Sequence, residues 1–174
     1  MRKTDAAFTE TLRQGLRASA VNVALLTTTD LEGRYHGLAV TTAVPFSNQQ
    51  PSMIVAVSHS ASAYPVIRDS GLFCLNQIAS CDLDILDRFS RSDQRAERFT
   101  SDAWRPGPHG LPYLETATAC FFCNVLGAHE YDDQTIFVSR IEDVRLGLRC
   151  GADGFDPLIW INGGPAKLAS REYA

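Results

Sequence analysis

The amino-acid sequence predicts a mainly β protein with peripheral helices, whose strands form an antiparallel barrel. Segments rich in β-branched residues recur along the chain. No helical pattern of ten residues separates consecutive strands, which disfavours a parallel βαβ sheet and favours an antiparallel barrel or sandwich. We choose the barrel. A length of 174 residues is typical of one domain, so residues 1–174 are assigned to a single domain.

Charge and composition disfavour several classes of protein. A net charge of −4 does not suit nucleic-acid binding, which requires a concentrated basic surface. The longest apolar runs fall far short of the ~20 residues that a membrane-spanning helix needs. Asp5 and Glu10 stand where a signal peptide would be apolar. We therefore expect a cytoplasmic protein that binds neither nucleic acid nor a membrane.

The first predicted element is a helix between Asp5 and Ser19. Phe8, Leu12 and Leu16 recur at intervals of four and form one narrow apolar stripe. A stripe of this kind is typical of a helix that packs on another surface.

A hairpin is predicted next, because residues 21–29 and 34–42 flank the turn sequence of residues 30–33. Residues 47–51 reverse the chain again, before a third strand over residues 52–57. A short helix follows over residues 63–70.

The remaining elements alternate less regularly. We expect a strand over residues 72–78 and a helix over residues 82–90. Residues 92–112 read as a long loop, either functional or a surface excursion. Two long strands are expected over residues 114–127 and 135–146, connected by residues 129–134.

The cysteines and histidines give little support to a metal site. Five cysteines are an odd number in a cytoplasmic-looking chain, so we expect all of them to be reduced. Cys120 and Cys123 form a single CxxC, but on a strand these two residues point to opposite faces. We interpret them as core residues. The four histidines lack the spacing of metal ligands, and no metal is predicted.

The hydroxyl cluster of Ser58, Ser60 and Ser62 is a candidate phosphate site. It precedes the predicted helix of residues 63–70, which has Pro65 near its start and Gly71 just beyond its end. Unpaired N–H groups at a helix start, together with hydroxyls, can bind a phosphate without a lysine. The alternative is that the serines only cap the helix.

The tract from Thr41 to Ser47 is a second candidate site. Its small side chains let a flat ligand approach the backbone and use the N–H and C=O groups for orientation. Pro45 cannot donate to a strand ladder, so this strand should be an edge or should end nearby.

The order of these residues resembles the short-chain flavin reductases, which bind FMN or FAD. The family pattern is met by Gly37-Leu38-Ala39, Thr41-Thr42-Ala43, Ser47, Gln50-Pro51 and Ser58-His59-Ser60, without a gap. Three positions depart from this pattern: Gln50 stands in place of the first of the family's two prolines, Ser58 in place of its Asn, and His59 in place of its Arg or Lys. Further matches are Phe73-Cys74-Leu75-Asn76, Asp84, Arg88-Phe89-Ser90 and the tail around Pro157-Leu158.

The resemblance implies a six-stranded antiparallel split barrel and a homodimer with flavin near the subunit boundary. It implies NAD(P)H-dependent reduction of FMN or FAD, with NADH or NADPH as co-substrate and a flavin-dependent monooxygenase as a possible partner. The implied flavin-binding residues are Thr41, Thr42, Ala43, Val44, Pro45, Ser47, Ser58, His59, Ser60 and Ser62. Asp133, Gln134 and Thr135 are implied to line the nicotinamide groove.

Flavin chemistry explains why no catalytic side chain stands out. Hydride passes from nicotinamide C4 to flavin N5, and the protein supplies orientation rather than an acid or a base. Gln134 stands where the family has His, and Asp132 adds negative charge where an anionic dinucleotide would dock. Two alternatives therefore stay open: a flavin-binding module that does not turn over free NAD(P)H, and an oxidoreductase that acts on another substrate through bound flavin.

Overall fold

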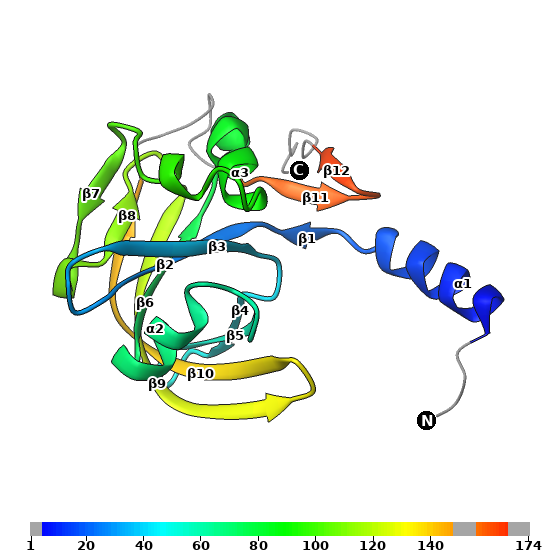
Figure 1. Ribbon diagram of the computed structural model, residues 1–174, viewed down its shortest axis with the longest axis horizontal. Helices are drawn as coiled ribbons and strands as arrows, with labels where there is room; N and C mark the ends of the chain where they lie inside the picture. Colours follow the sequence, from blue (N-terminus) through cyan, green and yellow to red (C-terminus); the bar gives the residue numbers. More distant parts are fainter. Residues whose placement is uncertain (1–4, 148–155, 167–174) are drawn as a thin grey trace, which may run out of the picture.

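The fold is built on one seven-stranded antiparallel sheet, with the strand order β3-β2-β6-β9-β10-β5-β4 (Figure 1). The computed structural model describes residues 5–147 and 156–166. The strands are β2 (Ala24–Thr29), β3 (Tyr35–Val40), β4 (Val44–Ser47), β5 (Ser52–Ser58), β6 (Leu72–Gln77), β9 (Ala119–Tyr131) and β10 (Gln134–Leu146). The prediction of a mainly β, antiparallel protein is confirmed. The sheet is not closed, because β3 and β4 are its edges.

The residues that the structure describes also form two smaller sheets. One contains β1 (Val21–Asn22), β11 (Ile159–Ile161) and β12 (Gly164–Ala166), and the other pairs β7 (Trp104–Pro106) with β8 (Pro112–Leu114). The single strand predicted over residues 21–29 is therefore wrong as one element: β1 pairs with β11, while β2 enters the main sheet.

The segment predicted as a long loop is more regular than expected. It contains β7, the start of β8, and the short 3-10 helices η2 (Arg95–Glu97) and η3 (Pro108–Gly110). Trp104 organises it, because this side chain is buried and its ring lies 5.0 Å from that of Phe99. The pattern of prolines and glycines did not reveal this packing of aromatic rings.

The described part of the chain has three α-helices: α1 (Ala6–Arg17), α2 (Tyr64–Ser70) and α3 (Leu83–Ser90), the last preceded by the 3-10 helix η1 (Ser80–Asp82). All three lie where the sequence predicts helices. Pro65 is in the first turn of α2, and Gly71 ends this helix in the left-handed conformation, with φ of 68°.

Helix α1 extends away from the rest of the molecule (Figure 1). Its apolar stripe lies on solvent, since Phe8, Leu12 and Leu16 are 58%, 48% and 66% exposed. The predicted helix is confirmed, but its stripe packs on no surface within the described residues.

The turn between β9 and β10 is shorter than predicted. The strands run to Tyr131 and from Gln134, which leaves only Asp132 and Asp133 in the turn instead of the whole of residues 129–134. Asp132 has a positive φ of 55°, which a two-residue hairpin turn requires.

Apolar side chains from alternate positions of the sheet form two buried clusters. Cys120 belongs to one with Leu25, and Cys123 to the other with Phe137. The prediction that these cysteines are core residues on opposite faces is confirmed. Cys74, Cys120 and Cys123 are free thiols, but Cys81 is disulfide-bonded, so the prediction that all five cysteines are reduced is wrong.

Neither a membrane span nor a metal cluster is found between residues 5 and 147 or 156 and 166. No helix there has the length and hydropathy to cross a membrane. Nor do three or more His, Cys, Asp or Glu side chains in these ranges come together as metal ligands.

Candidate functional site

Strand β5 brings the two predicted site regions together. Its neighbours are β4, which belongs to the Thr41–Ser47 tract, and β10, which begins at Gln134. Gln134 pairs directly with Ser58 at the end of β5. The serine cluster and the predicted groove residues therefore lie side by side.

The tract itself forms an open surface at the edge of the sheet. Thr41, Thr42, Val44 and Pro45 are exposed, while Ala43 and Ser47 are half-buried. Pro45 lies on edge strand β4, as expected for a residue without an N–H group.

Thr42 connects the tract to β5. Its hydroxyl accepts a hydrogen bond from the N–H of Ala56 and donates one to the C=O of the same residue, each at 3.1 Å. Just before β4 begins, the Thr42 side chain thus takes the place of a backbone strand partner for Ala56. Ala56 itself lies two residues before Ser58. This contact holds the backbone of the tract beside the serine cluster.

Thr41, the neighbouring residue, lines a cleft of about 160 Å³. The other lining residues come from β2, β3, α3, β11 and their ends: Val23, Ala39, Leu86, Ser90 and Trp160. The sequence did not assign Leu86 or Trp160 to a site. Trp160 reaches the cleft only because β1 pairs with β11, which brings the tail of the chain to the start of β2. The cleft is smaller than the ~300 Å³ of typical ligand pockets, so a flavin here would stay partly uncovered.

The serine cluster does not cap helix α2. The residue at the cap position is Ala63, which makes no side-chain capping bond. Ser58 and Ser60 instead contact each other through their hydroxyls at 2.9 Å, and the N–H of Ser60 donates to the Ser58 hydroxyl. Ser62 is half-buried in the following turn. The capping alternative is therefore wrong for these serines.

His59 is exposed and held on two sides. Its backbone N–H donates to the C=O of Asp133 at 2.8 Å. Its Nε2 lies 2.9 Å from the hydroxyl of Thr135, and its ring lies 4.6 Å from that of Tyr64. Tyr64 is a contact that the sequence did not indicate.

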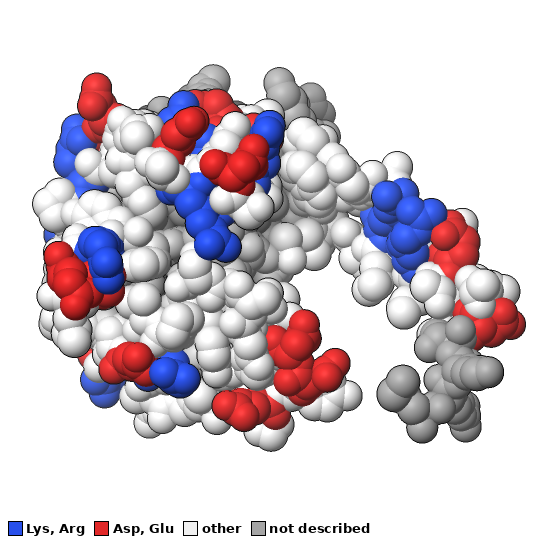
Figure 2. All heavy atoms as spheres, viewed as in Figure 1, with Lys and Arg blue, Asp and Glu red and all other residues white. Residues whose placement is uncertain are grey.

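The predicted groove residues differ in accessibility. Asp133 is exposed, Gln134 is half-buried and Thr135 is buried, with its hydroxyl directed to His59. Figure 2 shows acidic side chains gathered over the β9–β10 turn, where Asp132 and Asp133 are exposed.

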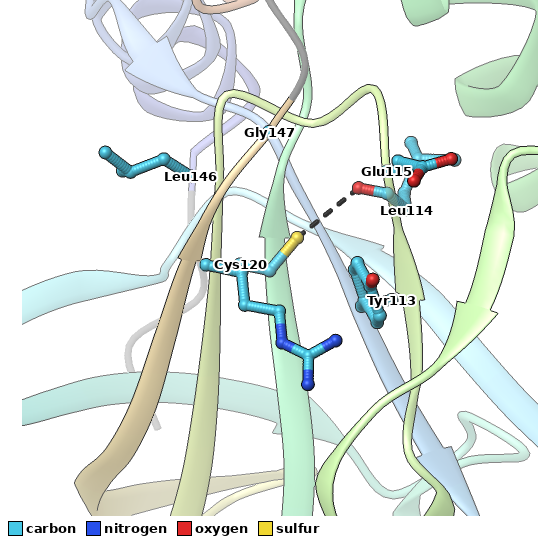
Figure 3. A pocket seen from close by; sticks show the side chains of 7 residues that line it. Tyr113, Leu114, Glu115, Cys120, Leu146 and Gly147 are labelled. Carbon is cyan, nitrogen blue, oxygen red and sulfur yellow. Dashed lines mark hydrogen bonds between the residues drawn. The ribbon is translucent and has the colours of Figure 1, made fainter.

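A second pocket of about 120 Å³ contains none of these residues (Figure 3). It lies between β8 and the ends of β9 and β10. The Arg145 guanidinium stacks there 4.7 Å from the ring centre of Tyr113, and the thiol of Cys120 donates to the C=O of Leu114 at 3.4 Å. This pocket is therefore separate from the predicted flavin-binding residues.

The site residues fit a flavin by their chemistry. Small side chains and an apolar cleft suit a flat ring, while the hydroxyls of Ser58 and Ser60 and the exposed imidazole of His59 are donors suited to a phosphate. No acid, base or nucleophile is needed for this arrangement to bind and orient a cofactor.

Comparisons with known proteins agree with this assessment. Residues 16–169 match the family described as flavin reductase like domain. A protein of Agrobacterium fabrum named FMN reductase (NADH) RutF is 30% identical over 83% of this chain and 78% of its own length.

Two solved structures share the fold. The nitrilotriacetate monooxygenase component B homologue from Mycobacterium thermoresistibile has a TM-score of 0.86 at 21% identity, over 97% of this chain and 91% of that one. BorF, the flavin reductase component of a bacterial two-component tryptophan halogenase, has a TM-score of 0.81 at 22% identity, over 94% of this chain and 99% of its own.

Proposed function

The chain belongs to the family of flavin-reductase-like domains, and on that premise we propose that it is an NAD(P)H-dependent flavin reductase. The observation that carries the proposal is the junction at β5, where the Thr42 hydroxyl binds Ala56 beside the Ser58–Ser60 turn. The flavin and the dinucleotide would supply the chemistry, a hydride transfer from nicotinamide C4 to flavin N5.

The chain's own residues would bind and orient. Thr41 and the backbone of the tract would contact the flavin ring beside the cleft, while Ser58, His59 and Ser60 would bind its phosphate. Asp133 and Gln134, next to this turn, would line the path of the dinucleotide. The name of the Agrobacterium fabrum relative favours FMN and NADH over FAD and NADPH. We propose that the reduced flavin is passed to a partner monooxygenase.

A flavin titration followed by rapid mixing tests this function. We expect the protein to quench FMN fluorescence, and NADH to bleach the bound flavin. Thr42→Trp should weaken FMN binding at least tenfold, because a bulky ring separates the tract from Ala56. Leu31→Trp, at an exposed turn position, is the control and should bind normally.

The outcomes of this experiment separate the candidate functions. Absence of flavin binding below millimolar concentration would contradict all of them. Flavin that binds but is not bleached by NADH or NADPH would favour the second candidate, a module that carries flavin without free NAD(P)H turnover. The exposed acidic pair of Asp132 and Asp133 beside Gln134 is the observation that favours this candidate. Bleaching by a different reductant would favour other flavin chemistry.

We further propose that the sheet is the six-stranded split barrel implied by the resemblance, with one additional edge strand. Contact between β3 and β5 supports this, because β3 is the first strand in the order and β5 the sixth, with only β4 beyond it.

A homodimer is the assembly that we propose. A helix of 12 residues is marginally stable in water by itself, so the exposed stripe of α1 needs a packing surface. Val44 and Phe46 on edge strand β4 are also exposed, at 48% and 62%, next to an incompletely covered flavin site. A second copy would cover both surfaces.

Leu12→Glu is expected to convert the dimer into a monomer, because it places a charge in the middle of the stripe. Light scattering should give twice the chain mass of 19.1 kDa for wild type, and the chain mass for the variant. Gln14→Glu, on the same helix but off the stripe, should remain dimeric. A monomeric wild type that binds FMN would contradict the proposed assembly.

A further inference from the structure

Three side chains from different elements form a connected group at the Ser58–Ser60 turn. His59 follows β5, Tyr64 begins α2, and Thr135 is the second residue of β10. His59 Nε2 lies 2.9 Å from the Thr135 hydroxyl, and this hydroxyl lies 3.2 Å from the Tyr64 hydroxyl. The group therefore links the end of β5 to two other elements through side chains alone.

Both supporting residues are themselves held by the core. Thr135 is buried at 2% exposure, and its backbone pairs with Val57 of β5. The Tyr64 ring lies 6.3 Å from that of Phe137, which is buried. His59 is exposed but rests against these residues, with its ring tilted 35° to that of Tyr64. The imidazole is thus a surface group in a defined orientation.

We propose that Thr135 and Tyr64 are positioning residues that hold the His59 imidazole so that it selects flavins carrying a phosphate. The proposal rests on the proposed function, since it assigns His59 to the flavin phosphate. It also gives Thr135 a role in orienting a neighbour, rather than in direct contact with the nicotinamide.

Hydrogen-bond chemistry explains how the arrangement works. Because Thr135 engages Nε2, Nδ1 is the ring nitrogen left to bind an anion. A hydroxyl both donates and accepts, so Thr135 can accept from a protonated Nε2 while donating to Tyr64, or accept from Tyr64 while donating to an unprotonated Nε2. In the first case a cationic His59, and in the second a neutral one, can present an Nδ1–H to a phosphate. The hydroxyl pair thus supports either protonation state without moving the ring.

The test compares FMN with riboflavin, which has the same ring but no phosphate. Thr135→Val keeps the shape of the side chain and removes its hydroxyl. We expect this variant to bind FMN about three- to tenfold more weakly, the loss of one partly exposed charge-assisted hydrogen bond, and to bind riboflavin as wild type does. Thr135→Ser should restore FMN affinity, and Tyr64→Phe should reduce it in the same direction.

A double-mutant cycle separates the positioning of His59 by Thr135 from a general structural role of Thr135. In a His59→Gln background, Thr135→Val should leave the ratio of riboflavin to FMN dissociation constants unchanged, because the group that it positions is gone. Equal weakening of FMN and riboflavin by Thr135→Val, or full FMN affinity in this variant, would overturn the inference while leaving the reductase proposal intact. A wild type that binds neither flavin would overturn both.

Discussion

Replacing Arg98 by methionine is expected to lower the free energy of unfolding by about 3–4 kcal/mol. The side chain is 8% exposed, and its guanidinium donates four hydrogen bonds to carbonyl oxygens, those of Gly37, Arg88, Phe89 and Arg91. Burial is the main cause that lowers the pKa of Arg98, and the nearby charge of Arg95 lowers this pKa further. An arginine nevertheless stays protonated in a protein. The cation sits at the carboxyl end of α3, where it complements the helix dipole.

The same substitution should loosen the cleft beside Thr41. Two of the carbonyls that Arg98 binds, those of Phe89 and Arg91, flank Ser90, which lines this cleft. A third belongs to Gly37, at the start of the sequence that resembles the flavin reductases. Urea denaturation measures the stability of the variant, and FMN titration measures the flavin affinity of its cleft. Arg95→Met, at an exposed position of the same segment, is the control and should change stability by less than about 0.5 kcal/mol. Stability of Arg98→Met equal to that of wild type would show that these bonds contribute nothing.

Replacing Asn76 by leucine is expected to cost about 3 kcal/mol, although the two side chains are similar in shape. Asn76 is completely buried on β6. Its Nδ2 donates to the C=O of Leu25 at 3.0 Å, and its Oδ1 accepts from the N–H of Leu114 at 2.8 Å. Leucine would leave the Leu114 N–H buried without this partner, and β8 would lose this hydrogen bond to β6.

Asn124→Leu is the matched control for Asn76. Asn124 lies on the neighbouring strand β9 and its amide donates to Glu142 near the surface, at 3.2 Å. Water can replace that bond, so we expect a loss below about 1 kcal/mol by urea denaturation. A loss for Asn76→Leu no larger than for Asn124→Leu would contradict the importance of the buried amide.

Asn76 also shows what a family resemblance does and does not reveal. The sequence match identified the position, but the buried contacts explain it as a structural joint between β2, β6 and β8. Arg98 gave no signal of this kind, because its partners are backbone atoms whose positions depend on how α3 packs on β3.

Local sequence patterns determined much of the secondary structure of this protein. Alternating and β-branched segments identified most strands, and Pro65 with Gly71 marked the ends of α2, because these signals act through backbone conformation within a few residues. The order of small residues, hydroxyls and Pro45 likewise determined which stretch carries the candidate site.

Only the tertiary structure decided how distant residues meet. Trp160 reaches the cleft through the pairing of β1 with β11, and Thr135 reaches His59 because β10 pairs with β5. These contacts join residues far apart in the sequence, and no local spacing encodes them. The stripe of α1 is the converse case: its period predicted burial, but burial also requires a facing surface, and the described residues do not supply one.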